Sequence, residues 1–246
     1  MNETTATLIQ TIADNQPRIK EEGKAVGRKE EHKAFWDSFQ SAKSNFWARY
    51  AGSGWNTETF RPKNDLNIVN GNASYCFAYT KCRVDMVDWC NQLGINIDIK
   101  PTVATGIFQS SEWTRVPVID TSLADSLSSS FAYCSYLVII DKLILKDDGS
   151  QAFANTFYDC KVLRDITIEG VIGKEVKLVW SPLLSNASIT SFINHLSTTT
   201  SGVPIIFSKT AVDNAFETSE GAADGSTSAE WLALVNTRKN WTISLH

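Results

Sequence analysis

Side chains that commonly do chemistry in proteins are scarce in this chain of 246 residues. It contains three histidines, His32, His195 and His246, and five cysteines, at positions 76, 82, 90, 134 and 160. The cysteines do not form the closely spaced C-x-x-C pairs that hold zinc. No serine, aspartate and histidine stand in a pattern that identifies a catalytic triad. We therefore assign no catalytic, cofactor-binding or metal-binding residue, and we expect a protein that is not an enzyme.

Two short motifs resemble ligand sites but are better interpreted as turns. Gly170 to Glu175 (GVIGKE) has two residues between its glycines, whereas a phosphate loop has four, and it lacks the serine or threonine after the lysine. Asp147 and Asp148 precede Gly149, which is typical of a turn. A weak cation site at these two aspartates is the less favoured alternative.

The composition indicates a folded chain without a polyanionic partner. Hydrophobic residues make up 43% and aromatic residues 11%, enough apolar surface to offset the entropy cost of ordering. Because 23 Lys and Arg face 27 Asp and Glu, we expect no nucleic-acid partner. The strongest apolar run, 137–145, is too short to cross a bilayer, and the first fifteen residues do not read as a signal peptide. We expect reduced thiols, synthesis in the cytoplasm and no membrane insertion.

Residues 1–34 form a charged N-terminal segment. More than half of the residues from 14 to 33 are charged or histidine, while Ile12, Ile19 and Val26 recur at intervals of seven. This spacing fits the seam of a short coiled coil, which would join protomers, for example as a homotrimer, or anchor the chain to a larger assembly. A single charged helix, or a partly ordered tail, remains the alternative.

Residues 35–72 are rich in aromatic side chains at first and irregular afterwards. The aromatic block is predicted to form a helix with a broad buried face that caps an open end of the fold. The glycines of 51–54 are expected to end this helix, and 55–72 to form an extended connection. The residues of the block are Phe35, Trp36, Phe39, Phe46, Trp47 and Tyr50.

The middle of the chain, 73–176, contains an internal repeat. The segments FAYCSYLVII, from Phe131, and FYDCKVLRDI, from Phe157, share phenylalanine, cysteine, leucine and isoleucine at an offset of 26. Looser copies begin at Phe77 and Phe108, so the intervals are 31, 23 and 26 residues. A unit of this length, with apolar residues at fixed places and a β-branched run after them, is typical of repeats that stack on one another.

The spacing within a unit has a physical reason. Phenylalanine, cysteine and leucine three residues apart share one face of a short helical turn, and a following strand directs alternate residues inward. Stacked units would then form a parallel β ladder. The predicted inward residues, or repeat anchors, are Phe77, Phe108, Phe131, Cys134, Leu137, Ile140, Phe157, Cys160, Leu163 and Ile166.

Residues 177–246 are expected to close the last repeat with alternating strands and helices. Strands are predicted at 177–180, 203–208 and 241–245, and helices at 188–196 and 228–238, with Ser228 as the N-cap of the second helix. Residues 217–227 are predicted to form an exposed loop. The overall fold class is therefore α/β, with N-terminal helices, a parallel β ladder and a strand-helix cap at the C-terminus.

The motif F-x-x-C-x-x-L followed by I-x-I, seen from Phe157 to Ile168, resembles the BspA-like class of bacterial leucine-rich repeats. The two ends of the chain are similar to leucine-rich-repeat proteins encoded by phages and prophages of gut Firmicutes. This resemblance implies a short, irregular leucine-rich-repeat solenoid. It also implies a non-enzymatic virion protein, located in the tail, baseplate or a head fibre and attached to other virion proteins by its N-terminal helix.

A binding surface is expected on the outside of the repeats. Tyr133, Tyr136 and Tyr158 flank inward anchors, so their rings are candidates for contact with a host-surface protein or glycan. The alternative is that they only cover the edge of the repeats. Two other functions remain open: a bacterial leucine-rich-repeat adhesin, and a glycan-active enzyme, which would need two convergent carboxylates about 5 to 10 Å apart.

Overall fold

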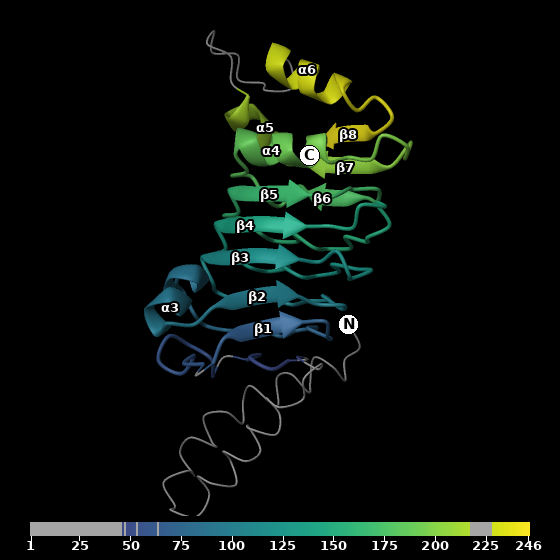
Figure 1. The fold of residues 1–246 in the computed structure, drawn as a ribbon. Coiled ribbons are helices and arrows are strands. Elements are labelled where there is room, and N and C mark those ends of the chain that lie inside the picture. Colours follow the sequence, from purple (N-terminus) through teal and green to yellow (C-terminus); the bar gives the residue numbers. More distant parts are fainter. Residues whose placement is uncertain (1–45, 47, 53, 63, 217–227) are drawn as a thin grey trace, which may run out of the picture.

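The computed structural model describes residues 46, 48–52, 54–62, 64–216 and 228–246. Figure 1 shows an elongated molecule in which short strands lie one above another along its length. The fold is mixed α/β, as the sequence predicts, and the strand pairs described are all parallel. The chain therefore winds around the long axis, because parallel neighbours require a crossover connection.

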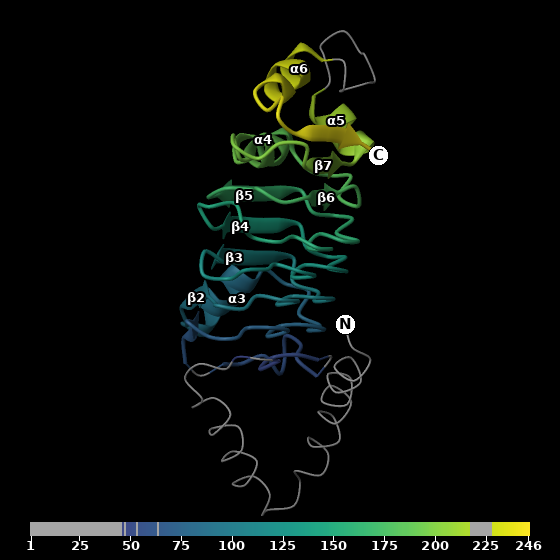
Figure 2. The same ribbon diagram turned by 90° about the vertical axis from the view of Figure 1, so that its right-hand side faces the viewer.

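The strands form three small sheets, and four helices are described. The sheets consist of β1 (Leu66–Val69) with β2 (Ile97–Lys100), then β3 (Arg115–Asp120), β4 (Ile139–Ile144) and β5 (Asp165–Glu169), and lastly β6 (Val176–Leu178), β7 (Pro204–Phe207) and β8 (Thr242–Leu245). The helices are α3 (Met86–Leu93), α4 (Asn186–Asn194), α5 (Lys209–Ala215) and α6 (Ala229–Asn236). Figure 2 shows α4, α5 and α6 at the C-terminal end of the stack and α3 beside the first strands.

Strands β1, β5, β6 and β7 bury alternate residues, as the two-residue period of a strand predicts. In β5, Ile166 and Ile168 are buried while Thr167 between them is exposed. Ile166 pairs with Ile140 of β4, so the inward side chains of successive strands lie over one another.

A second hydrogen-bond ladder joins the windings at a set of tight turns. The N–H groups of Tyr75, Phe77 and Tyr79 donate to carbonyl oxygens of residues 105, 107 and 109 at 3.0, 2.8 and 2.8 Å. The same alternate pattern links the five segments 48–52, 75–79, 106–110, 129–133 and 155–159. The offsets between the last four are the 31, 23 and 26 residues found in the sequence.

These five turns share an unusual backbone conformation. Each begins and ends with a residue of positive φ, and eight of these ten residues are not glycine, with φ between +49° and +62°. This left-handed conformation is costly for residues with a side chain. Because every turn is tied to its neighbour by several backbone hydrogen bonds, the stack stabilises a conformation that the residue types alone would not favour. The residues are Ala48, Tyr75, Gly106, Ser129 and Asn155 at the first position, and Gly52, Tyr79, Ser110, Tyr133 and Asp159 at the last.

Aromatic rings from the five turns form a continuous stack, the aromatic column, inside the molecule. Its members are Tyr50, Phe77, Phe108, Phe131 and Phe157. Successive ring centroids are 5.4, 5.0, 5.8 and 5.8 Å apart, with interplanar angles of 10° or less. Parallel strands lie about 4.8 Å apart, so rings of equivalent residues meet in an offset stack.

Two expectations for the first part of the chain are wrong where the structure describes it. The helix predicted over 35–50 lies mostly outside the described residues, and its described end, Ala48 to Tyr50, forms the first turn of the stack. The predicted irregular connection, 55–72, contains strand β1. In both cases parallel pairing with the next winding outweighs the local pattern. The predicted seam of Ile12, Ile19 and Val26 also lies outside the described residues.

Helix α3 was not predicted, although its ends carry recognisable signals. The side chain of Asp85 accepts hydrogen bonds from the backbone N–H groups of Val87 and Asp88, and Gly94 ends the helix at φ +68°. Arg115 of β3 bonds the Asp85 carboxylate at 3.2 Å and that of Asp141 at 2.6 Å, which ties the start of α3 to two windings.

The strand and helix predictions for the C-terminal region are confirmed. The strands β6, β7 and β8 and the helices α4 and α6 lie at the predicted places, within a few residues. The hydroxyl of Ser228 accepts the backbone N–H of Trp231 at 3.0 Å, as expected of an N-cap. Helix α5 was not predicted from the sequence. The loop predicted at 217–227 lies outside the described residues.

Candidate binding surface

The inward anchors include thiols that are enclosed by the windings. The Sγ atoms of Cys134 and Cys160 donate to the carbonyl oxygens of Phe108 and Phe131, each at 3.0 Å. Burial raises the pKa of the Cys134 thiol to about 12, and it raises the pKa of Cys160 well above its ordinary value. Both thiols are therefore protonated at neutral pH and serve as hydrogen-bond donors rather than nucleophiles. All ten repeat anchors are buried.

The two looser repeats carry other residue types at the cysteine position. The residues three places after Phe77 and Phe108 are Thr80 and Ser111, which are buried as Cys134 and Cys160 are in the later windings. Cys82 lies two residues after Thr80. A small side chain with a polar hydrogen satisfies this position, so its chemical identity varies while its place is kept.

Two residues that could bind a ligand or transfer a proton, His195 and Asp148, make local hydrogen bonds in the described part of the chain. His195 follows α4, and its Nδ1 lies 2.8 Å from the carbonyl oxygen of Ser191. The Asp148 carboxylate accepts the backbone N–H and the hydroxyl of Ser150, at 2.9 and 2.7 Å, which closes a turn. Within the described ranges no group of three or more His, Cys, Asp or Glu side chains is arranged to hold a metal. None of the helices described there is long and apolar enough to cross a membrane.

Three aromatic rings, one exposed and two half-buried, gather at turns of the last windings. Tyr133 is 49% exposed, and its ring centroid lies 5.1 Å from that of Tyr158 in the next winding. The ring centroid of Tyr158 lies 4.3 Å from that of Trp180, which follows β6. Tyr158 and Trp180 are both half-buried. We call Tyr133, Tyr158 and Trp180 the aromatic platform.

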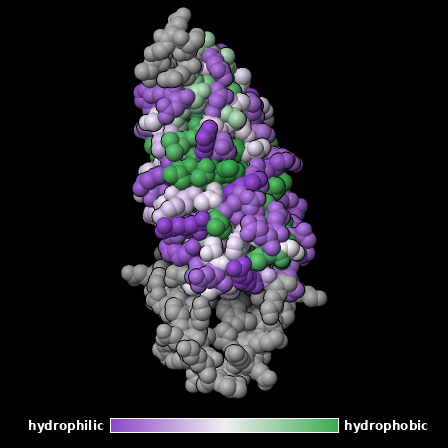
Figure 3. All heavy atoms as spheres, turned by 90° about the vertical axis from the view of Figure 1, so that its left-hand side faces the viewer, coloured by the Kyte–Doolittle hydropathy of each residue, from purple (hydrophilic) through white to green (hydrophobic). Residues whose placement is uncertain are grey.

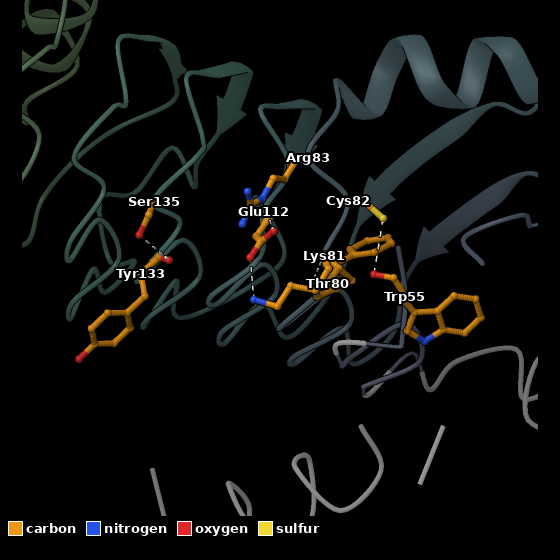
Figure 4. Close-up of polar contacts among 9 residues, drawn as sticks. Trp55, Thr80, Lys81, Cys82, Arg83, Glu112, Tyr133 and Ser135 are labelled. Atoms are coloured by element: carbon orange, nitrogen blue, oxygen red, sulfur yellow. Dashed lines mark hydrogen bonds and ion pairs between the residues drawn. The ribbon is translucent and has the colours of Figure 1, made fainter. Parts of the chain in front are cut away.

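The turn geometry explains why the Tyr133 ring faces solvent. Its N–H donates to the carbonyl oxygen of Tyr158 at 2.7 Å, and its left-handed backbone, at φ +61°, directs the side chain away from the core. Figure 4 shows the ring pointing away from the ribbon, on the side of the windings opposite the strands. The platform therefore lies on the turn side of the molecule.

Tyr136 lies in a different environment. It is 39% exposed, and the guanidinium carbon of Arg83 stands 4.3 Å from its ring centroid. Arg83 and Lys81 bond the two oxygens of the Glu112 carboxylate at 2.7 and 2.6 Å (Figure 4). Glu112 is largely buried, whereas about half of each cation is exposed. Of the three predicted surface tyrosines, the structure brings Tyr133 and Tyr158 into contact, and Tyr136 packs in this charged cluster.

Sequence reasoning missed the partners that build both arrangements. Trp180 appeared only as the end of a predicted strand, and Lys81, Arg83 and Glu112 carried no motif. Lys81 and Glu112 are 31 residues apart, so their pairing depends on the length of one particular winding. A prediction of which residues point outward at each turn would have identified Trp180 as a surface residue.

The Glu112 cluster makes a testable contribution to stability. Burial tends to raise the pKa of this carboxyl, but hydrogen bonds from Arg83 and Lys81 outweigh it, so the pKa lies below its ordinary 4.5. A lowered pKa stabilises the fold above the ordinary value, and this stability is lost as the pH falls through the lowered pKa. We expect Glu112→Gln to unfold more easily than wild type at pH 7, by about 1 kcal/mol because the cations are half exposed. The difference in the free energy of unfolding between Glu112→Gln and wild type should decrease towards pH 3.

Urea unfolding at both pH values measures this difference. Glu175→Gln is the matched control, because Glu175 pairs with Lys177 at 3.4 Å on an exposed surface and should change stability little at either pH. A Glu112→Gln deficit of equal size at pH 7 and pH 3 would show that the carboxylate charge is not what stabilises the cluster.

The described surface carries hydrophobic and aromatic side chains in separate places. Figure 3 shows one face on which hydrophobic residues lie in separate patches among polar ones. The aromatic platform adds two tyrosine rings and one indole ring on the turn side. Comparisons of the chain with protein-family models, with curated proteins and with solved structures find no match in any of the three.

Proposed function

We propose that the stacked windings form a short, irregular leucine-rich-repeat solenoid with a strand-helix cap at its C-terminal end. The proposal is supported by the agreement between the sequence offsets and the stacking of Phe77, Phe108, Phe131 and Phe157. It is also supported by the parallel strands and by the F-x-x-C-x-x-L motif. Each winding covers its neighbour's apolar face, which is the stabilising principle of such arrays.

We infer that the protein is a non-enzymatic structural component of a phage virion, associated with the tail, the baseplate or a head fibre. Residues 1–34 attach it to other virion proteins or to copies of itself, and the windings present a surface to a host-surface protein or glycan. The observation that carries the binding role is the exposure of Tyr133 beside Tyr158 and Trp180. The virion role rests on the resemblance of the chain's two ends to phage-encoded repeat proteins.

Mass spectrometry of density-purified phage particles tests the virion role. Peptides of this chain should band with the particles and withstand a high-salt wash. Their presence only in the host cell fraction would overturn the virion role and favour the alternative, a bacterial surface adhesin with leucine-rich repeats.

The role of the N-terminal segment is tested on the full chain by light scattering. If Ile12, Ile19 and Val26 form a coiled-coil seam, the triple substitution Ile12→Asp, Ile19→Asp and Val26→Asp should reduce the mass in solution from an oligomer, such as a trimer, to a single protomer. An unchanged mass would refute self-association through this seam.

A further inference from the structure

We propose that the aromatic platform binds the C–H face of a neutral hexopyranose in a host-surface glycan. This inference deepens the proposed binding function and rests on it. It names the ligand class for Tyr133, Tyr158 and Trp180, where the proposed function leaves protein and glycan open.

The chemistry of the rings carries the first step. The face of an aromatic ring has a partial negative charge, and a pyranose in its chair form presents polarised C–H bonds on one face and hydroxyl groups around its rim. Tyr133 offers an exposed ring. Tyr158 meets it edge-on, with ring centroids 5.1 Å apart at 65°, and Trp180 is tilted by 52° from Tyr158 at 4.3 Å, so the three rings form an angled aromatic surface. Tyrosine hydroxyls and the indole N–H add hydrogen-bonding groups at the edges of these rings.

The size of the platform favours a sugar over a protein. A stable protein interface needs about 800 Å² from each partner. Three aromatic side chains present about 150 to 250 Å² each when fully free, and Tyr158 and Trp180 are already half-buried. The remaining area is too small for a protein interface of ordinary size, whereas it is comparable to the face of one or two sugar rings.

The charges beside the platform favour a neutral ligand. The ammonium group of Lys161 pairs with the carboxylate of Asp159, the residue after Tyr158, at 2.9 Å. These two charges compensate each other. Lys81 and Arg83 lie in the other cluster, where both pair with Glu112.

Saturation-transfer NMR with the full-length protein tests the inference. The probes are the neutral tetrasaccharides of β-1,4-linked glucose and N-acetylglucosamine, with the anionic tetrasaccharide of galacturonic acid for comparison. We expect saturation at the ring C–H protons of at least one neutral probe and a weaker effect with the anionic probe. No saturation of either neutral probe, or a preference for the anionic probe, would overturn the proposal.

Substitutions connect the binding to the platform. Tyr133→Asn should weaken binding roughly tenfold, the equivalent of one lost aromatic contact, and asparagine tolerates the left-handed backbone at this position. Trp180→Ala should weaken it similarly, and Tyr133→Phe should retain most of it. Val118→Ala is the control, because Val118 is 46% exposed on β3, the strand side of the windings. Thermal unfolding of each variant verifies that it is folded.

The outcomes separate this inference from the proposed function. Sugar binding that is unchanged in both Tyr133→Asn and Trp180→Ala would overturn the platform as the site. If the protein bands with virions and binds host cells but binds no probe, the glycan inference fails and the virion role stands. If it binds the neutral probes through the platform but is absent from virions, the virion role fails alone.

Discussion

Phe131→Ala is expected to lower the free energy of unfolding by roughly 3 to 5 kcal/mol, the usual cost of truncating a buried phenylalanine. The ring is fully buried and lies between Phe108 and Phe157, with both centroids 5.8 Å away and planes within 7°. Its removal leaves a cavity that breaks the aromatic column in its C-terminal half. The backbone ladder on both sides of Phe131 limits how far the neighbouring windings can collapse into that space.

Urea unfolding followed by far-ultraviolet circular dichroism measures this loss as a lower midpoint. Leu123→Ala is the control, because Leu123 is 44% exposed and its truncation should cost less than about 1 kcal/mol. In a stacked array each winding contacts only its neighbours, so Phe131→Ala is also expected to weaken the coupling between the two halves of the stack. Equal losses for the two variants would refute the column as a principal source of stability.

The same column marks how far the sequence predicts the fold. Phe131 and Phe157 were recognisable because cysteine, leucine and isoleucine follow both at equal distances. The approximate period also identifies Phe77 and Phe108 as repeat anchors. It does not identify Tyr50, because Tyr50 is another residue type and lies in an aromatic block whose spacing also fits a helix. Only the pairing of its winding with residues 74–78 decides between the two.

The left-handed turns could not be predicted from residue types. Glycine is the usual signal for positive φ, yet Tyr75, Tyr79 and Tyr133 adopt it in this protein. Their conformation follows from the register of the backbone ladder, which is a property of the stack and absent from any local pattern. This also limited the prediction of the surface, since the backbone at Tyr133 directs its ring outward, whereas Tyr136 is held by Arg83 from a different winding.

Gly170→Ala is the second substitution with a large expected effect, roughly 3 kcal/mol or more. Gly170 follows β5 at φ +89°, and a Cβ atom there would lie 2.5 Å from the carbonyl oxygen of Leu145 and 2.9 Å from its carbon. The left-handed conformation costs an alanine about 1 to 2 kcal/mol, and forcing backbone atoms apart adds about 1 to 3 kcal/mol. The GVIGKE motif, which resembles a phosphate loop, thus needs its first glycine for close packing of two windings.

The neighbouring hydrogen bonds explain why this contact cannot relax cheaply. The N–H of Leu145 donates to Glu169 at 2.9 Å and that of Val171 to Lys146 at 3.0 Å, so bonds on both sides of Gly170 hold the two chain segments together. Gly202→Ala is the matched control, because Gly202 has φ +70° and nothing within 4 Å of the added Cβ. It should lose only the conformational part, about 1 to 2 kcal/mol. Thermal and urea unfolding of both variants separate the conformational cost from the cost of the steric contact. If Gly170→Ala lowers the free energy of unfolding no more than Gly202→Ala does, the contact with Leu145 relaxes without destabilising the fold.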